Sequence, residues 1–96
     1  MRFSWDERKR LTNLRKHLID FVGVEALFDG HTVTVEDNRF SYKERRFITF
    51  GLLNRQVVAV AHTETRDHIH VISIRKTYRH EQEAYFKYSP YTEIPH

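Results

Sequence analysis

The chain has 96 residues, a formal net charge of +3 at pH 7 and a pI near 9.4. This length suits one domain with a modest core, and 40% hydrophobic with 30% charged residues is a globular composition, which argues against disorder except at the ends. The sequence has no cysteine, which excludes disulfides and thiolate metal sites and favours a reducing cytoplasm. No long apolar run lies near the N-terminus, so we expect neither a signal peptide nor a membrane span. The mildly basic balance favours a polyanion as partner.

The first predicted elements are a short strand and a helix. Residues 2–5 (RFSW) alternate polar and apolar side chains and suit a short edge strand, and Asp6 suits the N-cap of the helix that follows. A stripe of leucines recurs at three- and four-residue steps and is expected to face the core: Leu11, Leu14 and Leu18. The roughly opposite side carries Lys9, Asn13 and Lys16, with His17 at its margin. The pattern predicts an amphipathic helix with a cationic outer face.

A second helix and four strands follow. Residues 22–28 are predicted to form a short helix that ends at the turn residues Asp29 and Gly30. From His31 the hydrophobic period changes to two, and strands are predicted over residues 31–37, 45–53, 56–64 and 68–75. Their connections are short and polar, so we expect an antiparallel meander. The run QVVAVA, which begins the third of these strands, is apolar on both faces and is expected to lie centrally, covered at least partly by the helices.

The C-terminal part returns to a helical period. Residues 78–88 (YRHEQEAYFKY) are predicted to form a helix, with Thr77 as its N-cap and an Arg79–Glu83 pair one turn apart. The Ser-Pro pair that follows is expected to end the helix, and residues 89–96 are expected to form a flexible tail. The chain is therefore predicted to be one α+β domain over residues 1–88, with two N-terminal helices, a four-stranded antiparallel sheet with a short edge strand beside it, and a C-terminal helix.

Common catalytic and metal signatures are missing from the sequence. It has no phosphate-binding glycine-rich loop, no nucleophile elbow and no H-E-x-x-H motif. His68 and His70 lie two residues apart on a predicted strand, so both point to one face and could bind zinc. The nearby carboxylates are limited to Glu64 and Asp67, so we favour a hydrogen-bonded or exposed histidine pair and expect no metal and no cofactor.

Cations gather at the ends of the predicted elements. They come from the first helix, from the segment before the second strand and from the end of the last strand: Lys9, Lys16, His17, Arg45, Arg46, Arg75 and Lys76. Arginine offers phosphate oxygens a planar fork of donors and lysine offers a point charge, so such a surface can hold a phosphodiester. Three tyrosines could stack on unpaired bases: Tyr42, Tyr78 and Tyr85.

Each of these features also has a purely structural interpretation. Charged strand ends resist edge aggregation, basic residues near a helix C-terminus favour its dipole, and tyrosines fill amphipathic seams. Composition alone favours this structural interpretation. A residue such as His17, considered by itself, is more often a cap or a packed imidazole than a catalyst.

The order of the residues carries more information than their composition. The opening FSWDERKRLTNLRKH resembles the start of BrnT-type toxins, whose pattern is F-x-W-D-x-x-K-x-x-x-N-x-x-K-H. The later segments ERRFITFG and HTETRDHIHVISIRKTYRHEQEAY are similar to two further segments of that family, in the same order. Matching residues in these later segments are Glu44, Arg46, Phe47, Gly51, Thr63, Ile69, Ile72, Ser73, Arg75, Lys76, Arg79, Glu81 and Tyr85. The resemblance spans residue 2 to about residue 86.

The chain departs from the family pattern at several positions. Leu18 stands where the family usually has a glycine, which would suit a left-handed C-cap, so a different exit from the first helix is expected. Residues 21–24 (FVGV) open the second helix more weakly than the usual Phe-Glu-Glu-Ala. Phe40, His70 and Ile74 replace a His, an Arg and an Ala, so no family role is transferred to them.

The resemblance implies a RelE-like fold and the activity of a ribonuclease toxin from a type II toxin–antitoxin pair. It also implies a BrnA-type antitoxin that binds DNA, so that the toxin reaches operator DNA only through the antitoxin complex. The cationic face predicts an acidic toxin-binding segment in that antitoxin. The expected partners are therefore RNA and the antitoxin, with no membrane. The expected outcome is inhibition of translation and growth.

RNA carries its own nucleophile, the 2′-OH, so such an enzyme needs neither a metal nor a covalent intermediate. We expect Arg46 and Arg75 to hold the phosphate and stabilise the transition state, and His17 or Glu44 to move protons. The residues expected to position the RNA are Lys9, Lys16, Lys76 and Tyr85. The rival hypothesis is a non-catalytic module that binds RNA or protein with the same basic face.

Overall fold

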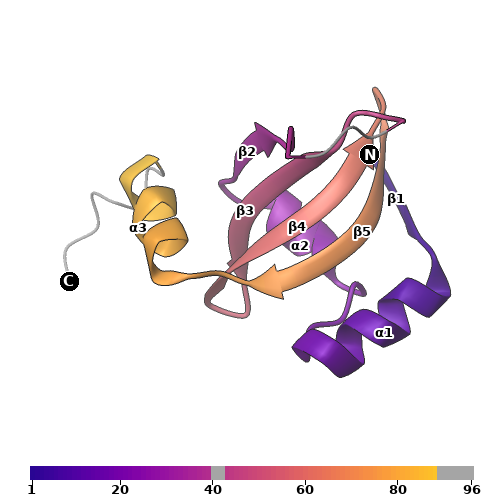
Figure 1. The fold of residues 1–96 in the computed structure, drawn as a ribbon, viewed down its shortest axis with the longest axis horizontal. Coiled ribbons are helices and arrows are strands. Elements are labelled where there is room, and N and C mark those ends of the chain that lie inside the picture. The colour runs from indigo at the N-terminus through magenta and orange to yellow at the C-terminus, as the bar shows by residue number, and fades with distance from the viewer. Residues whose placement is uncertain (40–42, 89–96) are drawn as a thin grey trace.

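The computed structural model describes residues 1–39 and 43–88. Within them, five strands and three helices follow one another in the chain (Figure 1). Their bounds are β1 (Arg2–Trp5), α1 (Glu7–His17), α2 (Val24–Asp29), β2 (Val33–Glu36), β3 (Phe47–Leu53), β4 (Gln56–Glu64), β5 (His68–Lys76) and α3 (Arg79–Tyr88). The α+β class is confirmed. None of the helices in these two ranges is long and apolar enough to cross a membrane.

The strands form one mixed sheet in the order β1-β5-β4-β3-β2. The antiparallel meander from β2 to β5 and the central place of β4 are confirmed. The short edge strand predicted over residues 2–5 is confirmed as β1. The sheet nevertheless has five strands and is mixed, because β1 pairs in parallel with β5, with Arg2 opposite His68 and Trp5 opposite Val71. A two-residue hydrophobic period shows which face of a strand is buried, but it does not encode the direction of the neighbouring strand.

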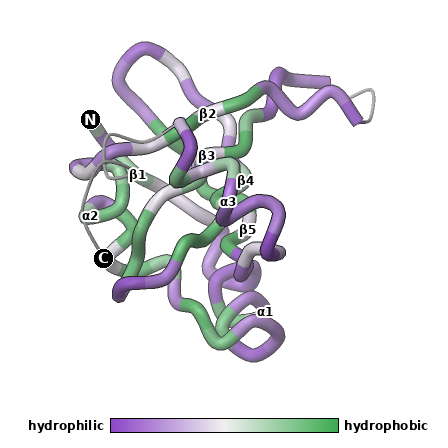
Figure 2. The backbone as a smooth tube through the Cα atoms, turned by 90° about the vertical axis from the view of Figure 1, so that its left-hand side faces the viewer, coloured by the Kyte–Doolittle hydropathy of each residue, from purple (hydrophilic) through white to green (hydrophobic). Residues whose placement is uncertain are grey.

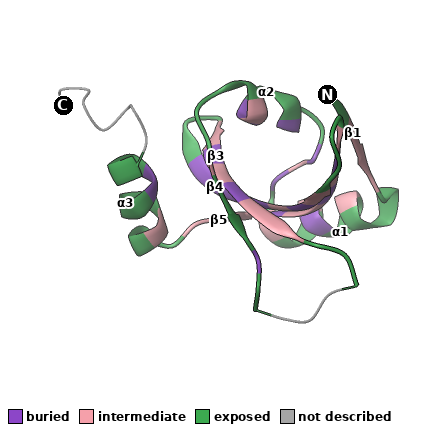
Figure 3. Cartoon of the chain, turned by 90° about the horizontal axis from the view of Figure 1, so that it is seen from above, coloured by how far each residue is buried: buried purple, intermediate pink, exposed green. Residues whose placement is uncertain are grey.

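The core lies on one face of this sheet. Register places Val58, Val60, Val71 and Ile74 on the same face, which we call the covered face. Helix α2 lies over it (Figure 3) and contributes Leu27, which is 1% exposed. A Cβ atom at Gly51 would come within 2.8 Å of the Leu27 side chain, so the glycine permits this close approach. The buried cluster also includes Ile19, Phe21, Val24 and Ile69.

Helix α1 meets the sheet with a different side from the predicted one. Asp6 is its N-cap, as predicted, and accepts hydrogen bonds from the backbone N–H groups of Arg8 and Lys9 at 2.8 and 3.3 Å. The leucine stripe does not face the core, since Leu11 is 45% exposed. The buried residue of the helix is Asn13, at 5% exposure.

Asn13 is buried because α1 lies against an open strand edge. Strand β1 pairs with β5 only as far as Val71, so Ile74 presents an N–H and a C=O that β1 does not reach. The Asn13 amide accepts from the N–H of Ile74 at 3.0 Å and donates to its carbonyl at 2.9 Å, and it also donates to the Ile19 carbonyl at 2.9 Å. This side chain therefore continues the hydrogen bonding of the sheet edge.

The turn after α1 and the start of α2 also differ from prediction. Leu18 has φ 61° and ψ 29° and donates its N–H to the Leu14 carbonyl at 2.9 Å. This is the left-handed exit that a glycine would give, so the expectation of a different exit was wrong. Helix α2 begins at Val24, two residues later than predicted, behind Gly23 at φ 96°, and Gly30 caps its end as expected.

Helix α3 is confirmed, but not its predicted cap. The Thr77 hydroxyl donates to the Val57 carbonyl at 2.8 Å, and the Glu81 carboxylate accepts from the backbone N–H of Tyr78 at 2.9 Å. The predicted Arg79–Glu83 ion pair is present at 3.2 Å. The predicted stop and tail at residues 89–96, and the positions of Phe40 and Tyr42, lie outside the described residues.

Candidate functional site

The second face of the sheet carries polar side chains from three strands and from the residue before β3. Register aligns Ser4 of β1, His70 of β5 and Thr63 of β4 across the sheet, and Arg46 lies beside Thr63 just before β3. These four residues, with Ser73 and Arg75 further along β5, define what we call the open face. Each of them is half-buried. The open face therefore offers an accessible polar floor.

His68 and His70 lie on the same face, as predicted, and converge on one hydroxyl. The Ser4 Oγ is 2.7 Å from the Nε2 of His68 and 2.8 Å from the Nδ1 of His70. A hydroxyl has a single hydrogen, so it donates to one imidazole and accepts from the other. The favoured interpretation of a hydrogen-bonded pair fits this contact. Among the described residues, no group of three or more histidine, aspartate or glutamate side chains could hold a metal ion.

A groove of about 270 Å³ runs between α1 and β5. Its lining comprises Arg8, Lys9, Thr12, Asn13, Lys16, His17, Ile72 and Ser73. The three α1 residues predicted to face RNA therefore share one groove, and this groove borders the open face at Ser73. The cationic side of the helix lies beside the sheet, not on its far side as predicted. A β-bulge at Ala61 and His62 makes Ile72 an extra residue on β5 and shapes the floor of the groove.

Arg75 is held firmly at the other end of the open face. Its Nη1 and Nη2 donate to the two carboxylate oxygens of Glu81 at 2.9 Å each, and Nη1 also donates to the Lys76 carbonyl at 3.1 Å. The guanidinium lies 5.6 Å from the ring centre of Tyr78. Hydrogen bonding to Glu81 raises the pKa of Arg75 and lowers that of Glu81. The Arg75 guanidinium is thus half-buried and ion-paired.

The connection between β2 and β3 brings further charge to this face. In Figure 2 its described part is mostly hydrophilic and projects away from the sheet. Arg46 lies 3.6 Å from Glu44, so the two predicted catalytic residues of this segment are paired with each other. Sequence reasoning missed Arg39, which binds the buried carboxylate of Asp37 at 2.8 Å. The charge of Arg39 opposes the rise in the pKa of Arg75, which is caused mainly by hydrogen bonding to Glu81.

Two residues predicted to bind RNA lie elsewhere. Lys76 is paired with Val58 in register and so belongs to the covered face, where it is exposed near the end of α1. Tyr85 is 2% exposed and donates its hydroxyl to the His31 carbonyl at 2.9 Å, so its ring is not available to stack on a base. Tyr78 is 66% exposed and stacks on His80 with ring centres 5.8 Å apart.

The basic groove and the open face together form a surface that can bind an extended polyanion. A basic groove with an imidazole lies along one side of the open face, and an oriented guanidinium lies at its end. None of the curated proteins searched matches the chain. A family profile described as "Ribonuclease toxin, BrnT, of type II toxin-antitoxin system" matches residues 5–81 and so includes both the groove and Arg75. The chain therefore belongs to the BrnT family of ribonuclease toxins of type II toxin–antitoxin systems.

Proposed function

We propose that this protein is a metal-independent endoribonuclease that acts in the cytoplasm, cleaves RNA on its open face and thereby inhibits translation and growth. Family membership supports ribonuclease activity, an RNA target and an antitoxin partner. Metal-independent cleavage on the open face is supported by the chemistry of the site, where arginine, lysine and histidine side chains surround a polar floor. The partner is proposed to be a BrnA-type antitoxin with an acidic toxin-binding segment, which carries the complex to operator DNA.

The hydrogen bonding of Arg75 is the observation that carries this proposal. Glu81 takes the end of the guanidinium formed by Nη1 and Nη2, and the Lys76 carbonyl takes another Nη1 hydrogen. The Nε–H and the remaining Nη2–H form a second fork that these three bonds leave for a ligand. Phosphate oxygens accept from such a fork in a bidentate way. Glu81 thus orients Arg75 without using up its capacity to bind a phosphate.

The reaction needs a group that accepts the 2′ proton and a group that protonates the departing 5′ oxygen. The 2′ oxygen attacks phosphorus, the bond from phosphorus to the 5′ oxygen breaks, and a 2′,3′-cyclic phosphate remains. His17 is the proposed proton-transfer residue, because it lies in the groove with Lys9 and Lys16. Glu44 suits this role less well, since it lies 3.6 Å from Arg46 and is not among the residues that line the groove.

Purified protein incubated with RNA in EDTA tests the proposal. We expect cleavage, whereas a non-catalytic binding module would leave the RNA intact. Arg75→Ala should lower the rate by about 10²–10³-fold, as expected for a lost electrostatic donor. The matched control is Arg79→Ala, because the Arg79 side chain is 92% exposed and pairs with Glu83 on its own helix. Equal rates for the two variants would contradict the role of Arg75.

The cellular consequence can be measured in a bacterium that expresses the toxin alone. We expect growth to stop and bulk translation to fall, and co-expression of the cognate antitoxin to restore both. Arg75→Ala should abolish the arrest at equal soluble expression. Normal growth with soluble wild-type protein would count against the toxin proposal.

A further inference from the structure

Leu18 has two features that do not favour the stability of the isolated chain, a left-handed backbone conformation and an exposed apolar side chain. It has φ 61°, in the left-handed region that glycine adopts without strain, and the chain has a leucine there. Its side chain is also 77% exposed, so the leucine gains little from burial. Backbone strain and an exposed apolar side chain at one position point to a contact outside the isolated chain.

Leu18 stands at the rim of a groove of about 500 Å³. Val22, which is 61% exposed, lies on the same rim. Its apolar lining includes the buried residues Ile19 and Val58 and the exposed Ala26. This groove shares no lining residue with the basic groove on the other side of α1. It is thus a separate apolar site next to the proposed RNA site.

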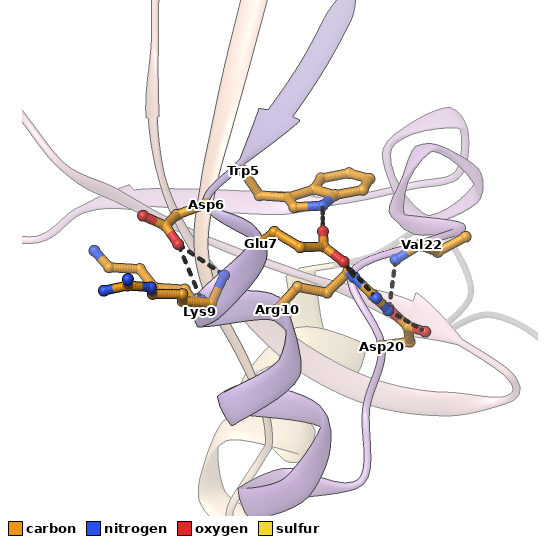
Figure 4. Close-up of polar contacts among 8 residues, drawn as sticks. Trp5, Asp6, Glu7, Lys9, Arg10, Asp20 and Val22 are labelled. Atoms are coloured by element: carbon orange, nitrogen blue, oxygen red, sulfur yellow. Dashed lines mark hydrogen bonds and ion pairs between the residues drawn. The ribbon is translucent and has the colours of Figure 1, made fainter.

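The apolar groove is lined by one exposed cation and one hydrogen-bonded carboxylate. Lys76 lines it and is exposed. Asp20 lines it too, but both of its carboxylate oxygens accept from Arg10 at 3.1 Å and one accepts from the Val22 N–H at 3.0 Å (Figure 4). Hydrogen bonds, first from the Val22 N–H and then from Arg10, lower the pKa of Asp20, so its carboxylate is already hydrogen-bonded within the protein. The groove therefore suits apolar side chains that are accompanied by a carboxylate.

We propose that this groove is the anchoring site of the antitoxin, which inserts apolar side chains beside Leu18 and Val22 and places a carboxylate on Lys76. The inference rests on the antitoxin partner of the proposed function. A second copy of this chain fits less well, because a protein with net charge +3 would bring cationic surfaces together. An antitoxin anchored here needs only to reach past the end of α1 to cover Lys16 and His17 in the basic groove.

The test uses two variants that should both bind the antitoxin less tightly without losing stability. Leu18→Gly removes the strain, so its melting temperature should rise, while its affinity for the antitoxin should fall at least tenfold. Val22→Ser should weaken binding similarly with little change in melting temperature. The matched control is Val35→Ser, on the far edge strand β2, where the valine is 47% exposed. The probe is the purified cognate antitoxin.

The outcomes separate this inference from the proposed function. RNA cleavage by the free toxin should be the same in all three variants and the wild type. If Leu18→Gly and Val22→Ser bind the antitoxin as the wild type does, the anchoring site is wrong while the ribonuclease proposal stands. If the purified antitoxin does not bind wild-type toxin at all, the partner assignment and this inference both fail. Sedimentation that shows a wild-type dimer abolished by Leu18→Gly would instead assign the groove to a second copy.

Discussion

His62 is a buried histidine on the covered face with a chain of hydroxyl partners. It is 1% exposed, and its ring lies 5.4 Å from the ring of Phe28 and 6.0 Å from that of Phe47. Its Nε2 is 2.7 Å from the Thr49 hydroxyl, which is 2.8 Å from the Thr34 hydroxyl. Burial lowers the pKa of His62 below its usual value. The folded protein therefore favours the neutral imidazole.

This depressed pKa predicts acid sensitivity. Because the pKa of His62 is lower in the folded than in the unfolded state, the unfolded state takes up the proton first as the pH falls through about 6.5. The stability contributed by the neutral ring is present above that pH and is lost below it. Glu64, whose carboxylate lies 3.9 Å from Nδ1, opposes the shift without cancelling it.

Chemical denaturation between pH 7.5 and 5 measures the effect. His62→Gln should be less stable than the wild type at pH 7.5 by about 1–3 kcal/mol, because it loses packing and disturbs the hydroxyl chain. Its free energy of unfolding should nevertheless fall less steeply as the pH drops. The six other histidines are common to both proteins, so the difference in slope isolates His62. Identical slopes would show that His62 does not control acid stability.

At the scale of elements, α1 is attached to the sheet by a polar residue more than by its leucines. Asn13→Ala removes three hydrogen bonds and leaves the N–H and C=O of Ile74 without them. An unsatisfied buried polar group costs about 1–3 kcal/mol, so we expect a loss of at least 2 kcal/mol in the free energy of unfolding. Leu11→Ala should cost less than about 1 kcal/mol, since Leu11 is 45% exposed. Urea unfolding of both variants measures these two losses in free energy of unfolding. A larger loss for Leu11→Ala than for Asn13→Ala would show that the leucines, and not Asn13, attach α1 to the sheet.

The same comparison shows how much of the structure the sequence can predict. Strand positions follow from a two-residue hydrophobic period, and β4 is found over the residues predicted for it. The orientation of α1 does not follow, because its partner at Ile74 is a backbone edge that carries no sequence signature. For the site residues, too, only the local arrangement is predictable. Lys9 and Lys16 lie on one side of α1 and share a groove, as helical spacing implies. The burial of Tyr85 and the pairing of Arg75 with Glu81 depend on how α3 packs, which local patterns do not specify.

At the scale of the whole molecule, charge governs how partners approach. The chain has a net charge of +3, and its basic groove is already suited to a polyanion. We expect the antitoxin to bring an acidic segment to this groove, and electrostatic steering of this kind raises the association rate more than the final affinity. The association rate should fall markedly between 0.01 and 1 M salt, as the Debye length decreases from about 30 Å to 3 Å. The dissociation rate should change less, because apolar contacts hold the docked complex.

Stopped-flow binding across a salt series measures both rates. A charge-reversed variant, Lys16→Glu, should reduce the salt dependence of association, whereas Arg79→Glu on α3 should leave it nearly unchanged. An association rate that does not respond to salt would mean that the antitoxin docks away from the basic groove and inhibits by another route.

The central claim is that RNA bound on the open face is cleaved without a metal ion, by attack of the 2′-OH of the RNA on the adjacent phosphate. The most direct measurement uses an RNA oligonucleotide that the protein cleaves in EDTA, compared with the same oligonucleotide carrying one 2′-O-methyl group at the cleaved position. We expect the unmodified RNA to give 2′,3′-cyclic phosphate and 5′-hydroxyl ends, and the methylated position to resist cleavage completely. Cleavage at the methylated position, or activity that disappears with EDTA and returns with a divalent cation, would contradict the mechanism.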